Sequence, residues 1–106
     1  MTTFNDKEKA AENKYAHDKE VEFKVHVRRN KLLGLWVAGK IGLTGAAAET
    51  YAKSVATVDL GKISEETVFH AVKKEFVAKR VSVSDHDIRA EMHRLLHIVR
   101  EEIATK

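Results

Sequence analysis

The stretch VSDHDIRAEMHRLLHIVREEI, residues 83–103, decides the fold class of this chain. Ser84 is a typical N-cap residue, and the carboxylates of Asp85 and Asp87 suit the positive end of a helix dipole. Apolar residues then recur every three or four positions, the spacing that aligns side chains along one side of an α-helix. The stripe consists of Ile88, Met92, Leu95, Leu96, Val99 and Ile103. The stretch therefore predicts an amphipathic helix over about residues 84–104.

Two helices are predicted upstream. Ser64 caps a helix over about 64–79, in which Glu65 and Glu66 occupy the first turn. Its buried side is predicted to contain Val68, Val72 and Phe76, with Phe69 beside them. Thr44 is predicted to cap a helix over about 45–59, after Gly42 has ended the preceding helix. The buried face of that slim helix is predicted to contain Ala47, Ala48, Tyr51, Ala52, Val55 and Val58.

The segment from residue 20 to 41 has two interpretations. Val21, Phe23, Val25 and Val27 alternate with polar residues, which taken alone indicates a strand. Read as a helix, the segment has one apolar side made of Val21, Val25, Leu32, Leu35 and Trp36. We favour the helix, because the chain has no proline and no turn residue breaks the sequence before this point. Four helices joined by short loops predict an all-α, antiparallel four-helix bundle.

The first twenty residues differ from the rest. They contain no Val, Ile or Leu, whereas the other 86 residues contain 24. Such a segment buries too little apolar surface to offset the entropy lost on ordering it. It has no Gly or Pro and is rich in Lys, Glu and Ala, which are good helix formers. We therefore expect residues 1–19 to be a mobile arm, disordered or partly helical when free, on a bundle of residues 20–106.

Composition excludes several classes of protein. The 106 residues include no cysteine, so disulfides and thiolate metal sites are excluded and a reducing compartment is favoured. No apolar run approaches the roughly 18 residues of a membrane span, and the start lacks a secretory signal. The carboxylates are scattered among Lys and Arg, and no nucleophile motif is present. We expect a cytoplasmic monomer that is not an enzyme, binds no metal and needs no cofactor.

Three stretches together resemble one known family. They are TTFNDKEKAAENKYAHD at 2–18, RRNKLLGLWVAGKIGL at 28–43 and VSDHDIRAEMHRLL at 83–96. In order and without large gaps, they are similar to the zeta subunit family, small alphaproteobacterial proteins that inhibit ATP hydrolysis by the rotary ATP synthase. The resemblance implies a four-helix bundle, which makes 21–27 helical. It also implies that the arm wedges as a helix into a catalytic α/β subunit interface of the synthase head and reaches the central γ rotor. The chain would then lie in the bacterial cytoplasm, peripheral to the inner membrane through the synthase.

The residues of the arm are compatible with such a wedge. Thr3 can cap a helix with Asp6 in its first turn, and Phe4, Ala11 and Tyr15 then form a narrow apolar stripe. Aromatic anchors suit insertion into a pocket, and charged neighbours can set the register. The predicted contacts are Thr3, Phe4, Asp6, Lys7, Lys9, Ala11, Asn13, Lys14, Tyr15, His17 and Asp18. For His17 and Asp18 an ordinary place on the helix surface is an equal alternative.

A cluster of basic residues follows the arm. The resemblance implies that the bundle binds ADP or ATP as a regulatory ligand, with phosphates meeting cations and Trp36 offering a stacking face. The candidate residues are Arg28, Arg29, Asn30, Lys31 and Trp36. The chain has no Gly-rich phosphate loop, so the residues alone do not lead to this site. A solvated helix turn, with Trp36 in the core, is the alternative.

Three histidines lie on one side of the last predicted helix. His86, His93 and His97 are predicted to face water, away from the apolar stripe, and Arg89 and Arg100 beside them oppose a bound cation. A pH-responsive surface is therefore favoured over a metal site. The net charge of +3 and the 28–31 cluster leave another function class open, a small basic nucleic-acid-binding or adaptor module. Interspersed acidic residues argue against nucleic acid as a partner.

Overall fold

The computed structural model describes the backbone of residues 3–57 and 65–104, and the side chains of 20–57 and 65–103. The described residues form four helices: α1 (Thr3–Lys40), α2 (Gly45–Ala56), α3 (Glu65–Ala78) and α4 (Asp85–Ala104). The predicted all-α class is confirmed, and residues 21–27 are helical rather than extended. The longest dimension, 64 Å, follows from α1, since 38 residues at 1.5 Å each span about 57 Å.

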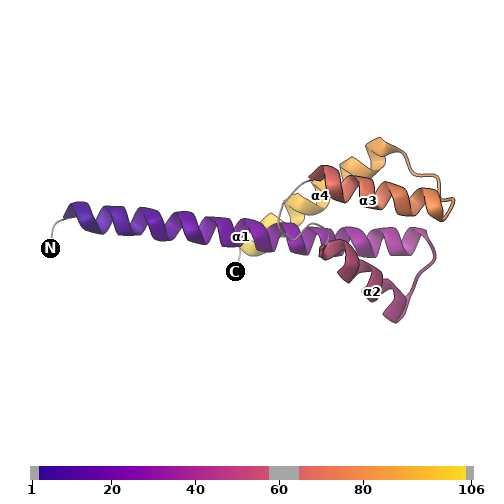
Figure 1. Ribbon diagram of the computed structural model, residues 1–106, viewed down its shortest axis with the longest axis horizontal. Coiled ribbons are helices and arrows are strands. Elements are labelled where there is room, and N and C mark those ends of the chain that lie inside the picture. Colours follow the sequence, from indigo (N-terminus) through magenta and orange to yellow (C-terminus); the bar gives the residue numbers. More distant parts are fainter. Residues whose placement is uncertain (1–2, 58–64, 105–106) are drawn as a thin grey trace.

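The helices run alternately up and down (Figure 1). From the turn after Lys40, α2 runs back along one side of α1, while α3 and α4 lie on the other side. The first half of α1 extends beyond the other three helices (Figure 1). α1 has no break at residue 20, so one helix contains both the predicted arm and the first helix of the bundle.

The core lies where α1 meets its three neighbours. The predicted stripe of α4 is buried, except that Ile103 is half-buried, and the predicted side of α3 is buried together with Phe69. Of the predicted α1 stripe only Val25 is buried, and Val21, Leu32, Leu35 and Trp36 are half-buried. The fully buried residues of α1 include Leu33 and Val37, which the stripe omitted. The predicted stripe lies along one edge of the buried band, which is wide because neighbouring helices cover α1 from two sides.

The helix ends agree with most of the predicted caps. The Ser84 Oγ accepts a hydrogen bond from the Asp87 backbone N–H at 3.0 Å. Gly42, with φ +85°, ends α1, and the Leu43 N–H donates to the Ala38 carbonyl at 2.8 Å, as in a Schellman turn. Thr44 occupies the predicted N-cap position of α2, but its side chain makes no capping hydrogen bond.

Other differences concern α2 and the link that follows it. Ala47 is exposed and Ala48 and Tyr51 are half-buried, while Ala52, Val55 and Ala56 form the buried face. The predicted roles of Val58 and of the Ser64 cap lie outside the described residues. α2 buries only its C-terminal half because its N-terminal turns lean away from α1 (Figure 1).

Candidate functional site

The residues that the resemblance assigns to the synthase form the first half of α1. The eleven predicted contacts from Thr3 to Asp18 have their backbone in that helix, and their side chains lie outside the described residues. The first buried side chain on described α1 is Val25, and half-buried Val21 packs against it. The core that the structure describes therefore begins after the arm.

The predicted basic cluster is spread over several faces of the bundle. Consecutive residues of a helix are turned by 100°, so the four residues 28–31 point in different directions. Arg28 lies 3.8 Å (Nε–Oε2) from Glu102 of α4, and Lys31 lies 3.8 Å (Nζ–Oε2) from Glu49 of α2. Asn30 is buried and accepts a hydrogen bond from Arg29 Nε at 2.9 Å. These four residues do not converge on one ligand position.

Arg29 is the main polar group of the interior, with 1% of its surface exposed. Its Nη1 donates to the Met92 carbonyl of α4 at 3.4 Å and to Glu65 Oε1 of α3 at 3.3 Å. Burial lowers the pKa of the guanidinium, and the hydrogen bond to Glu65 opposes that shift. The group nevertheless stays protonated, as arginine does throughout the accessible pH range. Arg29 therefore ties three helices together.

A histidine that the sequence did not single out extends this network. Arg29 Nη2 lies 3.4 Å from His26 Nδ1, and His26 Nε2 lies 3.5 Å from Glu22, which also pairs with Arg100 of α4 at 3.1 Å. Burial, together with the positive charge of Arg29, lowers the pKa of His26, while Glu22 and Glu65 act in the opposite direction. The imidazole is thus held neutral to lower pH than usual. In the sequence, only the i, i+3 spacing of His26 and Arg29 on one predicted helix indicated that the two side chains could meet.

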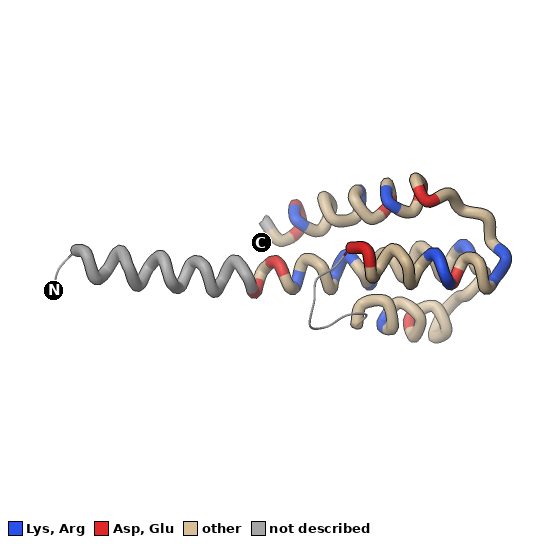
Figure 2. Tube along the Cα trace, turned by 45° about the horizontal axis from the view of Figure 1, so that its top comes forward, with Lys and Arg blue, Asp and Glu red and all other residues tan. Residues whose placement is uncertain are grey.

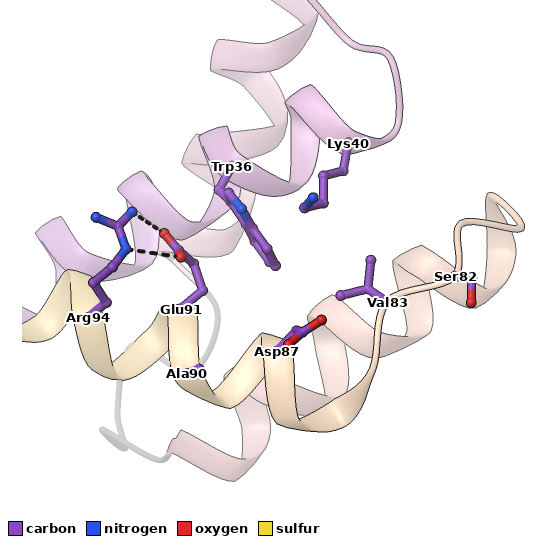
Figure 3. A pocket seen from close by; sticks show the side chains of 8 residues that line it. All are labelled: Trp36, Lys40, Ser82, Val83, Asp87, Ala90, Glu91 and Arg94. Atoms are coloured by element: carbon purple, nitrogen blue, oxygen red, sulfur yellow. Dashed lines mark hydrogen bonds and ion pairs between the residues drawn. The ribbon is translucent and has the colours of Figure 1, made fainter.

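Trp36 lies apart from that network, at a cavity of about 350 Å³ between the end of α1 and the start of α4 (Figure 3). Its ring meets Phe76 edge-on, with centroids 5.8 Å apart, and the Lys40 ammonium is 5.3 Å from its centroid. Arg94 and Glu91 form an ion pair on the other side of the cavity. The lining residues are Trp36, Lys40, Ser82, Val83, Asp87, Ala90, Glu91 and Arg94. The cavity offers an aromatic edge with charges of both signs.

The three histidines of α4 are exposed, as predicted. His97 Nε2 lies 3.1 Å from Glu101 Oε1, an exposed i, i+4 pair. Among residues 20–57 and 65–103, no three His, Asp or Glu side chains are grouped as metal ligands would be. Basic and acidic residues are interspersed along the described helices (Figure 2). None of these described helices is long and apolar enough to cross a membrane.

Comparison with known proteins supports both fold and family. A solved structure described as a solution NMR structure is 31% identical to this chain, with a TM-score of 0.68. The match covers 79% of this chain and 95% of that one. Comparison with the curated proteins finds no match. The model of the family "ATPase inhibitor subunit zeta" matches residues 1–102, arm and bundle together. The chain therefore belongs to the ATPase inhibitor subunit zeta family.

Proposed function

We propose that this protein inhibits ATP hydrolysis by the rotary ATP synthase through insertion of residues 1–19 into a catalytic α/β subunit interface. The observation that carries the proposal is the family match over residues 1–102, which includes the whole arm. The chain would act at the catalytic head, with its α, β and γ subunits as partners. It would perform no chemistry of its own.

The continuity of α1 supports the arm as the inserted element. Starting a helix is costly because the first turn fixes three residues for one hydrogen bond, whereas each further residue adds one bond. The packed part of α1, anchored at Val25, Leu33 and Val37, supplies that first turn. The arm continues that helix toward its N-terminus, since α1 is unbroken from Thr3 to Lys40. Its ordering on a partner therefore costs less than the folding of a free peptide.

The mechanism we propose depends on direction. Each catalytic interface opens and closes in turn as the rotor moves, and a helix held in a closing interface opposes the next step of hydrolysis. Rotation in the synthetic direction would reopen that interface and release the helix. We therefore propose an inhibitor of hydrolysis that leaves synthesis largely unaffected.

Deletion of residues 2–19 tests this proposal. The deletion removes none of the described core, which begins at Val21, so helical circular dichroism and a cooperative urea transition should persist. The shortened protein should no longer slow ATP hydrolysis by the purified cognate head. Retained inhibition by the folded deletion variant would show that the arm is not the inhibitory element.

We also propose that the bundle binds adenine nucleotide beside Trp36. At that cavity the Lys40 ammonium lies 5.3 Å from the centroid of the indole ring, whereas Arg29 is buried and engaged. Titration with ADP should then shift the Trp36 indole NMR signal and leave the backbone amides of 28–31 unchanged. Shifts confined to 28–31 would contradict this placement. We do not favour a nucleic-acid partner, because Asp and Glu are interspersed with Lys and Arg along the described helices (Figure 2).

A further inference from the structure

The side of α1 that packs against α2 continues beyond the end of α2. Gly34 marks this side, since a Cβ atom there would lie 3.2 Å from Val55 of α2. Because α2 runs antiparallel to α1 and ends at Ala56, its last turn lies beside Gly34. Val27 and Phe23 occupy the same side two and three turns farther along α1, about 10 and 16 Å from Gly34.

These residues form an apolar groove that α2 does not reach. The groove has a volume of about 250 Å³, and its lining is almost entirely apolar surface: Phe23, Lys24, Val27, Arg28 and Lys31. Phe23 is 41% exposed, one of two large hydrophobic residues exposed to this degree in the described part of the chain. The other is Val77 of α3. We call the five lining residues the α1 groove.

The rim of the α1 groove is basic. Lys24, Arg28 and Lys31 lie along one edge and contribute their aliphatic stems to its wall. Each is 3.8 Å from a carboxylate of this chain: Glu20, Glu102 and Glu49, respectively. These separations exceed hydrogen-bond length, and exposed pairs of this kind contribute little stability. The three cations can therefore pair with carboxylates of a partner.

From this juxtaposition we propose that the α1 groove is a second contact with the synthase head and takes an acidic amphipathic helix. The inference rests on the proposed inhibitory function and adds a docking surface for the bundle. The incoming helix would lie in line with α2, bury an apolar side chain against Phe23 and Val27, and oppose carboxylates to the basic edge. A second copy of this chain is disfavoured, because a symmetric contact would place the same three cations against themselves.

The test measures the protein concentration that halves ATP hydrolysis by the purified cognate head. Phe23→Ser should raise that concentration about tenfold or more, since a buried aromatic anchor contributes at least a tenfold change in affinity. Val77→Ser is the control, because it removes the other exposed large hydrophobic residue from a different helix, and it should change that concentration less than about twofold. Lys24→Glu should also weaken inhibition, with an effect that shrinks at high salt, whereas Lys74→Glu on α3 should not.

The outcomes separate this inference from the proposed function. The α1 groove contact alone would be overturned by one set of results. The unaltered chain would inhibit fully, Phe23→Ser and Val77→Ser would halve hydrolysis at the same concentration, and so would Lys24→Glu and Lys74→Glu. Absence of inhibition by the unaltered chain would overturn both proposals. A dimer in sedimentation that Phe23→Ser dissociates would assign the groove to a second copy and likewise overturn the inference. If Phe23→Ser loses its cooperative urea transition, the comparison of Lys24→Glu with Lys74→Glu decides.

Discussion

Replacement of Gly34 by alanine tests the close approach of α1 and α2 at this glycine. A Cβ atom at this position would lie 2.7 Å from the Cα atom of Ala52, and 3.2 and 3.3 Å from the Cβ atoms of Val55 and Ala52. Carbon atoms in contact normally lie about 3.5–4.0 Å apart. The nearest atom belongs to the backbone of α2 and cannot rotate away. The whole helix must therefore move by about 1 Å.

Two opposing effects set the size of the change in stability. Overpacking a closely fitted interior costs about 1–3 kcal/mol. We take the upper end, because backbone rather than a flexible side chain must shift. Alanine gains about 1 kcal/mol over glycine in a helix interior. Gly34→Ala should therefore lower the free energy of unfolding by about 2 kcal/mol, which corresponds to a fall in Tm of roughly 10 °C for a chain of this size.

Gly39 provides the matched control on the same helix. A Cβ atom there would meet nothing within 4 Å, so Gly39→Ala retains the gain in helix propensity without the clash. We expect it to raise stability by about 0.5–1 kcal/mol. Urea titration followed by circular dichroism, with thermal unfolding alongside, measures both variants. If Gly34→Ala proves as stable as Gly39→Ala, the close approach of α1 and α2 does not exist as described.

Three further predictions concern helix ends and pH. Ser84→Ala should lower the free energy of unfolding by about 1 kcal/mol, because it removes the hydrogen bond from the Asp87 N–H. Thr44→Ala loses no such bond and should change the urea midpoint little. Equal losses in the two variants would contradict the assigned caps. Arg80, in the turn after α3, has φ +57° and is the only described non-glycine residue with positive φ. Arg80→Gly should therefore raise the free energy of unfolding by about 1 kcal/mol in the same titration. A fall in that free energy would show that the Arg80 side chain contributes more than its backbone strain costs. The pKa of His26 in the folded protein lies below its usual value of 6.5, so the unfolded chain takes up a proton first as the pH falls below 6.5. The contribution of His26 to stability is therefore complete above that pH and declines below it. His26→Gln should remove this decline, so that its urea midpoint changes less between pH 7 and 5. An unchanged pH profile in that variant would exclude His26 as the cause.

The fold was largely predictable because the sequences of α3 and α4 each combine a periodic row of apolar residues with acidic residues in the first turn. In α4 the i, i+3/i+4 stripe and the Ser84 cap agree, and the structure buries that stripe. α1 was harder to predict. Its buried band includes Leu33, Gly34 and Val37, because helices lie on both sides of it, and periodicity alone does not state how many neighbours a helix has. Thr44 takes the N-cap position without the capping hydrogen bond, because residue type sets a preference for the position and does not guarantee the bond.

The candidate site was less predictable, for reasons of helix geometry. A run of basic residues looks like one patch in the sequence, but Arg28 and Lys31 reach different helices and Arg29 is buried. Arginine is almost never fully buried unless it is paired, so nothing in the sequence marked Arg29 as a core residue. The Trp36 cavity joins residues more than 40 positions apart, which only the tertiary structure brings together.

The continuity of α1 also fixes an angular phase between the arm and the bundle. Because both belong to one helix of 38 residues, insertion of a single residue near position 20 would turn everything upstream by 100° and advance it by 1.5 Å. Insertion of seven residues, by contrast, would nearly restore the original azimuth while lengthening the rod by about 10 Å. The bundle thus fixes which side of the N-terminal turns faces a partner. Insertions or deletions in a short exposed section of α1 can change the length of the arm and its rotation about the helix axis separately.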